Sequence, residues 1–178
     1  MATGALLWER PFASSNFTNS ITPLRFGQSV VVWNNNGPMR AVTIARRDNK
    51  WVAEESWTSD DPPNRLSNTV LDGDVMFGIT QRNMGQYYAV DLKTGKTLWA
   101  SEGRQALNVA VERAGDIIFS MENDGELVIF RASRTGFELI KRYRVAPEEM
   151  YSTWAQPAIS GNRIFVRDAS TLALWTIN

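Results

Sequence analysis

The sequence contains no cysteine and no histidine among its 178 residues. The lack of cysteine excludes disulfides and thiolate zinc sites, and the lack of histidine removes the usual general base and any Ser-His-Asp triad. An excess of one charge is also missing, because 19 basic side chains balance 19 acidic ones. This balance argues against a nucleic-acid partner. We therefore expect no catalytic residue, no metal ligand and no cofactor.

Long apolar runs are absent as well. No stretch approaches the roughly 20 apolar residues that cross a bilayer, so we expect no membrane span. Residues 1–12 lack the basic start, the apolar run and the cleavage site of a signal peptide. The length of the chain still suits one domain with a sizeable core.

The chain does contain a repeated succession of short strand-like runs and turns, seen best in residues 73–99. The first strand-like run, residues 75–79, follows Gly73-Asp74. The second, residues 87–91, follows the turn at residues 81–86, and the third begins at residue 97 after Lys93-Thr94-Gly95-Lys96. Gly, Asp and Thr at each break are typical of tight turns between strands. No segment has sustained helical periodicity, so the sequence predicts an all-β protein.

The same plan occurs four times along the chain. The turn glycines Gly27, Gly73, Gly115 and Gly161 are 46, 42 and 46 residues apart. Periods of about 40–45 residues, with about four strands each, are typical of β-propeller blades. We therefore predict a single propeller domain over residues 1–178, built from four-stranded antiparallel blades, with an evenly spaced β-sandwich as the alternative. The blades are expected at about residues 18–61, 64–104, 106–147 and 151–178.

The fourth blade has only three strand candidates, and residues 4–11 offer one more. An unpaired apolar edge invites aggregation, so we expect the N-terminal strand, Ala5 to Arg10, to complete the last blade. Pairing within one chain would close a four-bladed ring. Exchange of this strand between two chains would give a homodimer with an eight-bladed ring. The sequence leaves both forms open.

The segment Ala89-Val90-Asp91-Leu92-Lys93-Thr94-Gly95-Lys96-Thr97-Leu98-Trp99 resembles the signature of pyrroloquinoline-quinone-type propeller repeats. Thr3-Gly4 with Trp8 is a partial copy, because Trp8 follows Gly4 by the same four positions. The signature has a structural reason, since Asp and Thr can cap the turn and Gly supplies a positive φ. Residues 152–168 resemble the final blade of such proteins.

This family includes quinoprotein dehydrogenases and an outer-membrane assembly lipoprotein, so the resemblance implies export to the periplasm or cell surface. Family dehydrogenases hold the quinone under a vicinal cysteine pair, with calcium bound by carboxylates. The cysteine pair is impossible here, and Asp72-Gly73-Asp74 and Asn123-Asp124-Gly125 are interpreted as turns. Function is therefore expected to be non-catalytic: a binding or scaffold propeller of the bacterial cell envelope that takes a protein, peptide or polymer. The alternatives are a degenerate fragment of a quinoprotein oxidoreductase and an enzyme of other chemistry, such as a lyase or hydrolase on a propeller.

Propellers bind partners over the central channel, through loops that enter the innermost strands. We therefore predict a partner-binding face at Asn64, Arg65, Arg104, Gln105, Asn108, Tyr151, Trp154 and Gln156. Arg, Tyr and Trp together are typical of binding hot spots. The alternative is that the two aromatic side chains pack between blades and the arginines are solvated.

Overall fold

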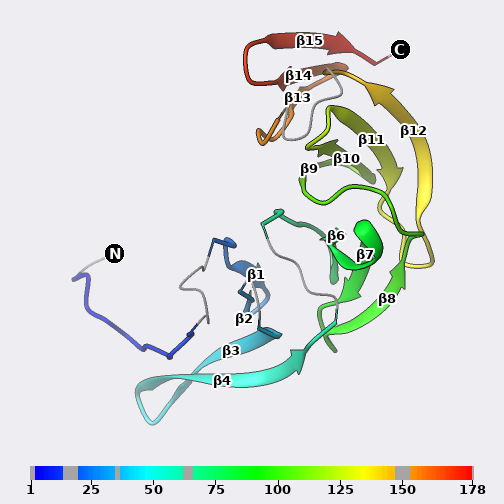
Figure 1. The fold of residues 1–178 in the computed structure, drawn as a ribbon. Coiled ribbons are helices and arrows are strands. Elements are labelled where there is room, and N and C mark those ends of the chain that lie inside the picture. Colours follow the sequence, from blue (N-terminus) through cyan, green and yellow to red (C-terminus); the bar gives the residue numbers. More distant parts are fainter. Residues whose placement is uncertain (1–2, 14–19, 35–36, 62–65, 147–152, 178) are drawn as a thin grey trace.

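The computed structural model describes residues 3–13, 20–34, 37–61, 66–146 and 153–177. These residues form four antiparallel sheets, of which three have four strands and one has three. The sheets succeed one another along an open arc, with the first strand of each on the concave side (Figure 1). The prediction of an all-β protein with four propeller blades is confirmed. Within the described ranges, no helix is long and apolar enough to cross a membrane.

Each sheet is one blade, and its strands follow chain order. Blade 1 contains β1 (Leu24–Phe26), β2 (Ser29–Val32), β3 (Met39–Arg47) and β4 (Lys50–Ser59). Blade 2 contains β5 (Val70–Asp72), β6 (Val75–Thr80), β7 (Gln86–Asp91) and β8 (Lys96–Ala100), with the short 3-10 helix η1 (Arg82–Met84) between β6 and β7. Blade 3 contains β9 (Val109–Ala114), β10 (Ile117–Glu122), β11 (Glu126–Arg131) and β12 (Glu138–Arg144). Blade 4 contains β13 (Ala158–Ser160), β14 (Arg163–Arg167) and β15 (Leu172–Thr176).

The repeated glycines occupy the same turn in all four blades, between the first and second strands. Their φ angles are 58°, 58°, 62° and 61°, in chain order. Side chains with a Cβ rarely adopt this left-handed region, which explains why glycine recurs at this point. The spacing read from the sequence therefore follows from one turn conformation repeated in each blade.

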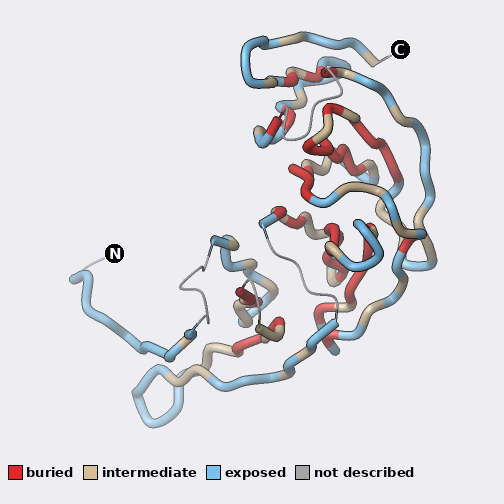
Figure 2. The backbone as a smooth tube through the Cα atoms, in the orientation of Figure 1, coloured by how far each residue is buried: buried red, intermediate tan, exposed pale blue. Residues whose placement is uncertain are grey.

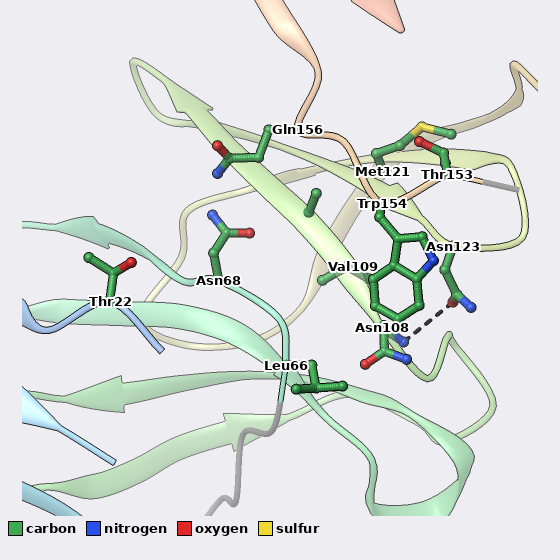
Figure 3. Close-up of a pocket in the computed structure, with 11 residues that line it drawn as sticks. Thr22, Leu66, Asn68, Asn108, Val109, Met121, Asn123, Thr153, Trp154 and Gln156 are labelled. Atoms are coloured by element: carbon green, nitrogen blue, oxygen red, sulfur yellow. Dashed lines mark hydrogen bonds between the residues drawn. The ribbon is translucent and has the colours of Figure 1, made fainter. Parts of the chain in front are cut away.

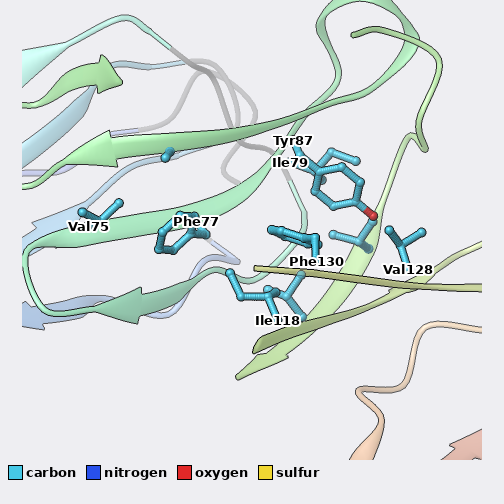
Figure 4. Close-up of a cluster of buried hydrophobic side chains, with 10 residues drawn as sticks. Val75, Phe77, Ile79, Tyr87, Ile118, Val128 and Phe130 are labelled. Carbon is cyan, nitrogen blue, oxygen red and sulfur yellow. The ribbon is translucent and has the colours of Figure 1, made fainter. Parts of the chain in front are cut away.

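The core lies in the three seams between neighbouring blades, and the outermost strands stay exposed (Figure 2). The seam between blades 2 and 3 buries an apolar cluster that includes Phe77, Tyr87, Ile118 and Phe130 (Figure 4). The ring of Phe137 stacks on Tyr87, with centroids 5.2 Å apart. Such aromatic contacts add to the stabilisation that burial provides.

Two tryptophans fasten one blade to the next. Trp57 on β4 donates its indole N–H to the carbonyl of Leu92 in blade 2, over 2.8 Å. Trp99 on β8 makes the equivalent bond to Ser133 in blade 3, over 2.9 Å. Trp99 of the repeat signature therefore joins blade 2 to blade 3. In blade 3 the strand register places Lys141, opposite Ile129, at the equivalent position, and this residue is exposed.

The N-terminal strand does not complete the last blade within this chain, so this part of the prediction is wrong for the single chain. Residues 4–13 contain no strand, and β15 pairs only with β14. The N-terminal segment instead lies beside blade 1, where Arg10 forms an ion pair with Glu55 of β4 at 3.0 Å. The arc holds this segment and β15 at opposite ends (Figure 1), and they do not meet.

Candidate functional site

A hollow of about 240 Å³ lies on the concave side of the arc, where blades 2, 3 and 4 meet. We call it the channel-side hollow. Its lining comprises Thr22, Leu66, Asn68, Asn108, Val109, Ala110, Met121, Asn123, Thr153, Trp154 and Gln156. None of these side chains is charged, so the hollow offers neutral polar groups and apolar surface.

Trp154 is the largest exposed group of the channel-side hollow, at 56% exposure. Its ring lies over the end of the hollow formed by Asn108 and Val109, and Gln156 and Asn68 lie toward the other end (Figure 3). The segment that carries Trp154 precedes β13. Thr153 on this segment is fixed to blade 4, because its hydroxyl donates to the carbonyl of Arg167 over 2.6 Å.

Amide side chains hold the inner strands together. Asn68 donates through Nδ2 to the carbonyl of Val111 and accepts the Val111 N–H at Oδ1, each over 2.8 Å. It therefore acts as an extra strand residue alongside β9. Gln156 donates to the same Val111 carbonyl over 3.3 Å. Blades 2 and 4 are thus both tied to β9 at the base of the hollow.

Asn108 is one of the buried polar residues that line the hollow. Its backbone N–H donates to Oδ1 of Asn123 over 3.3 Å (Figure 3), and its carbonyl accepts the Asn123 N–H over 3.1 Å. The side-chain oxygen of Asn108 accepts from Gln81 over 3.4 Å. Across the described part of the chain, no hydrogen bond uses the Asn108 Nδ2 group or the Gln156 Oε1 atom. Both residues line the hollow, so these two groups are available to a ligand.

The structure brings together three of the predicted partner-binding residues: Asn108, Trp154 and Gln156. Arg104 is exposed and outside the hollow, with its backbone N–H bonded to Asn83. Gln105 is engaged elsewhere, since its side-chain oxygen accepts a hydrogen bond from Arg142 on β12. The other three, Asn64, Arg65 and Tyr151, lie outside the described residues.

The sequence interpretation missed Asn68, Asn123 and Thr153 as lining residues. Asn123 was assigned to a hairpin turn alone, although it also faces the hollow. A signal was present, because Asn68 and Asn108 each precede the first strand of their blade, 40 residues apart. A polar amide that recurs at one repeat spacing points to a shared place on the inner edge.

A buried carboxylate lies in the seam between blades 2 and 3, outside the hollow. Glu122, at 1% exposure, accepts a hydrogen bond from the Tyr87 hydroxyl over 2.9 Å, and Nη1 of Arg142 is 3.6 Å away. Burial raises the pKa of the Glu122 carboxyl to about 8, against the lowering effects of Tyr87 and Arg142. The carboxyl group is therefore largely protonated at neutral pH. It contributes to packing and not to the lining of the hollow.

The side chains of the described regions do not fit a calcium-bound quinone. They contain no group of three or more His, Cys, Asp or Glu that could hold a metal ion. Calcium sites use six to eight oxygen ligands, several of them carboxylates. The hollow supplies only amides, hydroxyls and one indole as polar groups. We therefore derive no redox step for this chain.

Comparisons with solved structures place the fold among propeller proteins. The computationally designed Ika4 protein superposes with a TM-score of 0.72 and 15% identity, over 99% of this chain and all of that one. BamB from Moraxella catarrhalis gives a TM-score of 0.65 and 18% identity, over 97% of this chain and 52% of that one. A quinohemoprotein alcohol dehydrogenase from Pseudomonas putida gives a TM-score of 0.51 and 14% identity, over 72% of this chain and 21% of that one. This chain therefore spans about half the length of that BamB.

Comparison of the sequence with family models gives a more specific result. No curated protein matches the sequence. The model described as outer membrane protein assembly factor BamB matches residues 1–101, which is more than half of the chain. This match covers the Thr94-Gly95-Trp99 signature and its partial copy at Thr3-Gly4-Trp8, and it confirms the resemblance drawn from them. The chain belongs to the pyrroloquinoline-quinone-type repeat family of the outer membrane protein assembly factor BamB.

Proposed function

We propose that this protein is a non-catalytic propeller of the bacterial envelope that binds an extended peptide segment in the channel-side hollow. The observation that carries the proposal is Trp154, an exposed indole above a hollow lined by neutral amides. Large apolar groups exposed beside polar ones are typical of binding sites, because their burial in a complex is favourable.

The chemistry of the lining favours a peptide. Asn and Gln side chains carry the same donor and acceptor as a peptide group, so they can bond to the backbone of an extended segment. Asn108 Nδ2 and Gln156 Oε1 supply one donor group and one acceptor on the same hollow. The absence of charge from the lining favours neutral backbone over an anionic ligand. Trp154 can then cover one apolar side chain of the segment.

Family membership supports the place of action. The family model is described as an outer membrane protein assembly factor, a description that names outer-membrane proteins. Strands of outer-membrane barrels alternate apolar and polar residues over about ten positions. A segment of this kind presents apolar side chains to one face and leaves its backbone groups unpaired before it folds. We therefore propose that the segment comes from an exported strand-forming protein, and that this chain acts in the periplasm.

The test is the affinity for synthetic ten-residue peptides of alternating apolar and polar residues, measured by calorimetry. Trp154→Ala should weaken binding by more than tenfold, since loss of a tryptophan hot spot typically costs at least about 2 kcal/mol. The matched control is Trp51→Ala, because Trp51 is also exposed but lies on β4, away from the hollow.

The control variant should bind the peptides as the parent chain does. Equal affinity of the Trp154→Ala variant and the parent would overturn the proposal. So would saturable binding of a neutral polysaccharide with no binding of the peptides, because the hollow would then recognise a different polymer.

A further inference from the structure

The outer edge of β15 is an open sheet edge. The N–H of Ile177 donates to the carbonyl of Asn162 over 2.8 Å, which fixes the register of the β14–β15 pair. Alternate residues of an antiparallel strand direct their backbone groups to opposite sides. Leu172, Leu174 and Thr176 therefore direct their N–H and C=O groups away from β14. Within the described residues no strand meets this edge.

The side chains of β15 are correspondingly uncovered. Leu172 and Leu174 are 72% and 55% exposed. In the other blades the third strand is covered by a fourth, so that most residues of β7 and β11 are buried. An apolar edge with free hydrogen-bonding groups is a template for a further strand. Blade 4 thus lacks a strand whose place and direction are both defined.

The N-terminal segment has the features of that strand. Gly4 has a φ of 66°, and Gly95, which opens the outer strand of blade 2, has a φ of 71°. Trp8 follows Gly4 by four positions, as Trp99 follows Gly95. Leu6 and Leu7 are exposed, and residues 5–10 pair with no described strand. The segment already has the turn conformation and the spacing of an outer strand.

The position of the N-terminal segment indicates with which blade it can pair as a strand. Trp57 and Trp99 each reach from an outer strand into the following blade. The N-terminal segment lies on the free side of blade 1, held by the ion pair between Arg10 and Glu55. It therefore lies where the outer strand of a blade preceding blade 1 would lie. Blade 4 of the same chain is at the other end of the arc (Figure 1).

We infer that two copies of this chain exchange their N-terminal segments, so that residues 5–10 of each copy form the fourth strand of blade 4 in the other. Antiparallel pairing places Gly4 beside the end of β15 and Arg10 beside its start. Two arcs joined head to tail in this way close a ring with two-fold symmetry, in which the last blade of each copy has its fourth strand.

The experiment measures the mass of the full chain in solution by light scattering, over a range of concentrations. The expected mass is twice the 20.0 kDa of one chain, with a melting midpoint that rises with concentration. Leu174→Pro removes an N–H that faces the open edge and leaves the bonds to β14 intact, as proline on an edge strand does. This variant should be a monomer with an unchanged far-ultraviolet spectrum.

Matched variants separate pairing from side-chain loss. Leu174→Thr keeps the N–H and should remain a dimer. The double variant Leu6→Pro and Leu7→Pro removes two successive N–H groups, one of which must face β15, and should be a monomer. The inference would be overturned by a monomeric parent at every concentration, or by a dimer that survives both proline variants. The mass measurement tests strand exchange and the peptide titration tests the proposed function, so failure of one leaves the other unaffected.

Discussion

Replacing Gly95 with alanine should lower the free energy of unfolding more than the same replacement at Gly73. Both glycines have positive φ, at 71° and 58°, and a residue with a Cβ in this region costs about 1–2 kcal/mol. At Gly95 the added Cβ would lie 2.4 Å from Cε3 of Trp57, whereas nothing lies within 4 Å at Gly73. Overpacking of this kind costs about 1–3 kcal/mol more.

The larger effect has a structural reason. Trp57 joins blade 1 to blade 2 through its bond to Leu92, so a displacement of the ring would disturb that bond. The measurement is urea unfolding of the two variants and the parent, followed by the far-ultraviolet spectrum. Equal midpoints for Gly95→Ala and Gly73→Ala would show that the contact with Trp57 is not required in solution.

Replacing Glu122 with glutamine should remove a pH dependence of stability. The pKa of the Glu122 carboxyl is about 8 in the folded chain, against 4.5 for the ordinary carboxyl. The folded chain therefore holds more protons than the unfolded chain between these values. The free energy of unfolding should fall as pH rises through this window, by up to about 1.4 kcal/mol per pH unit. The glutamine side chain cannot ionise, and it can still accept the Tyr87 hydrogen bond.

The measurement is thermal or urea unfolding at intervals from pH 5 to pH 9. Glu122→Gln should be more stable than the parent at the alkaline end and should lack the slope. Glu138→Gln is the control, because this carboxyl group lies at the start of β12 and pairs with Arg131. It should keep the slope of the parent. A parent whose stability does not change across the window would contradict the assigned pKa.

Local turn chemistry was enough to predict most of the fold. The Thr94-Gly95 turn and the four glycines between first and second strands each require a positive φ, and glycine meets that need visibly in the sequence. The spacing of these turns then gave the number of blades. The partner of residues 5–10 could not be derived this way, because strand pairing between distant segments depends on the curvature of the whole arc.

The candidate site was less accessible to sequence reasoning. Asn108, Trp154 and Gln156 were found because they precede first strands, which meet at the concave side. Arg104 and Gln105 share that position in the sequence, but the positive φ of Arg104, 62°, belongs to a turn bonded back to Asn83. The residue types typical of binding hot spots led us to expect arginine at the site, whereas the polar lining of the hollow consists largely of Asn and Gln side chains. Residue type alone could not separate these outcomes.

Glu122 was missed for a different reason. It ends the apolar run Ile117–Glu122, and a glutamate at the end of a strand ordinarily faces solvent. Here the seam with blade 2 covers it, and the Tyr87 hydroxyl supplies its hydrogen bond. An acidic residue in a mostly apolar strand could have indicated a buried carboxyl group. Its hydrogen-bond partner, Tyr87, lies in another blade and could not be identified from the sequence.

The tryptophan hydrogen bonds of outer strands cross only the first two of the three seams between the described blades, and this difference sets the order in which the blades separate. Repeat proteins lose structure through nearest-neighbour interfaces, so the interface with the fewest fastenings separates first. The first two seams each have an indole bond, while blade 3 has the exposed Lys141 in that position. Amide protons of β13, β14 and β15 should therefore exchange with solvent sooner than those of β6 and β7. In an isolated chain, blade 4 then acts as a hinged end that can receive a strand before the rest of the molecule moves.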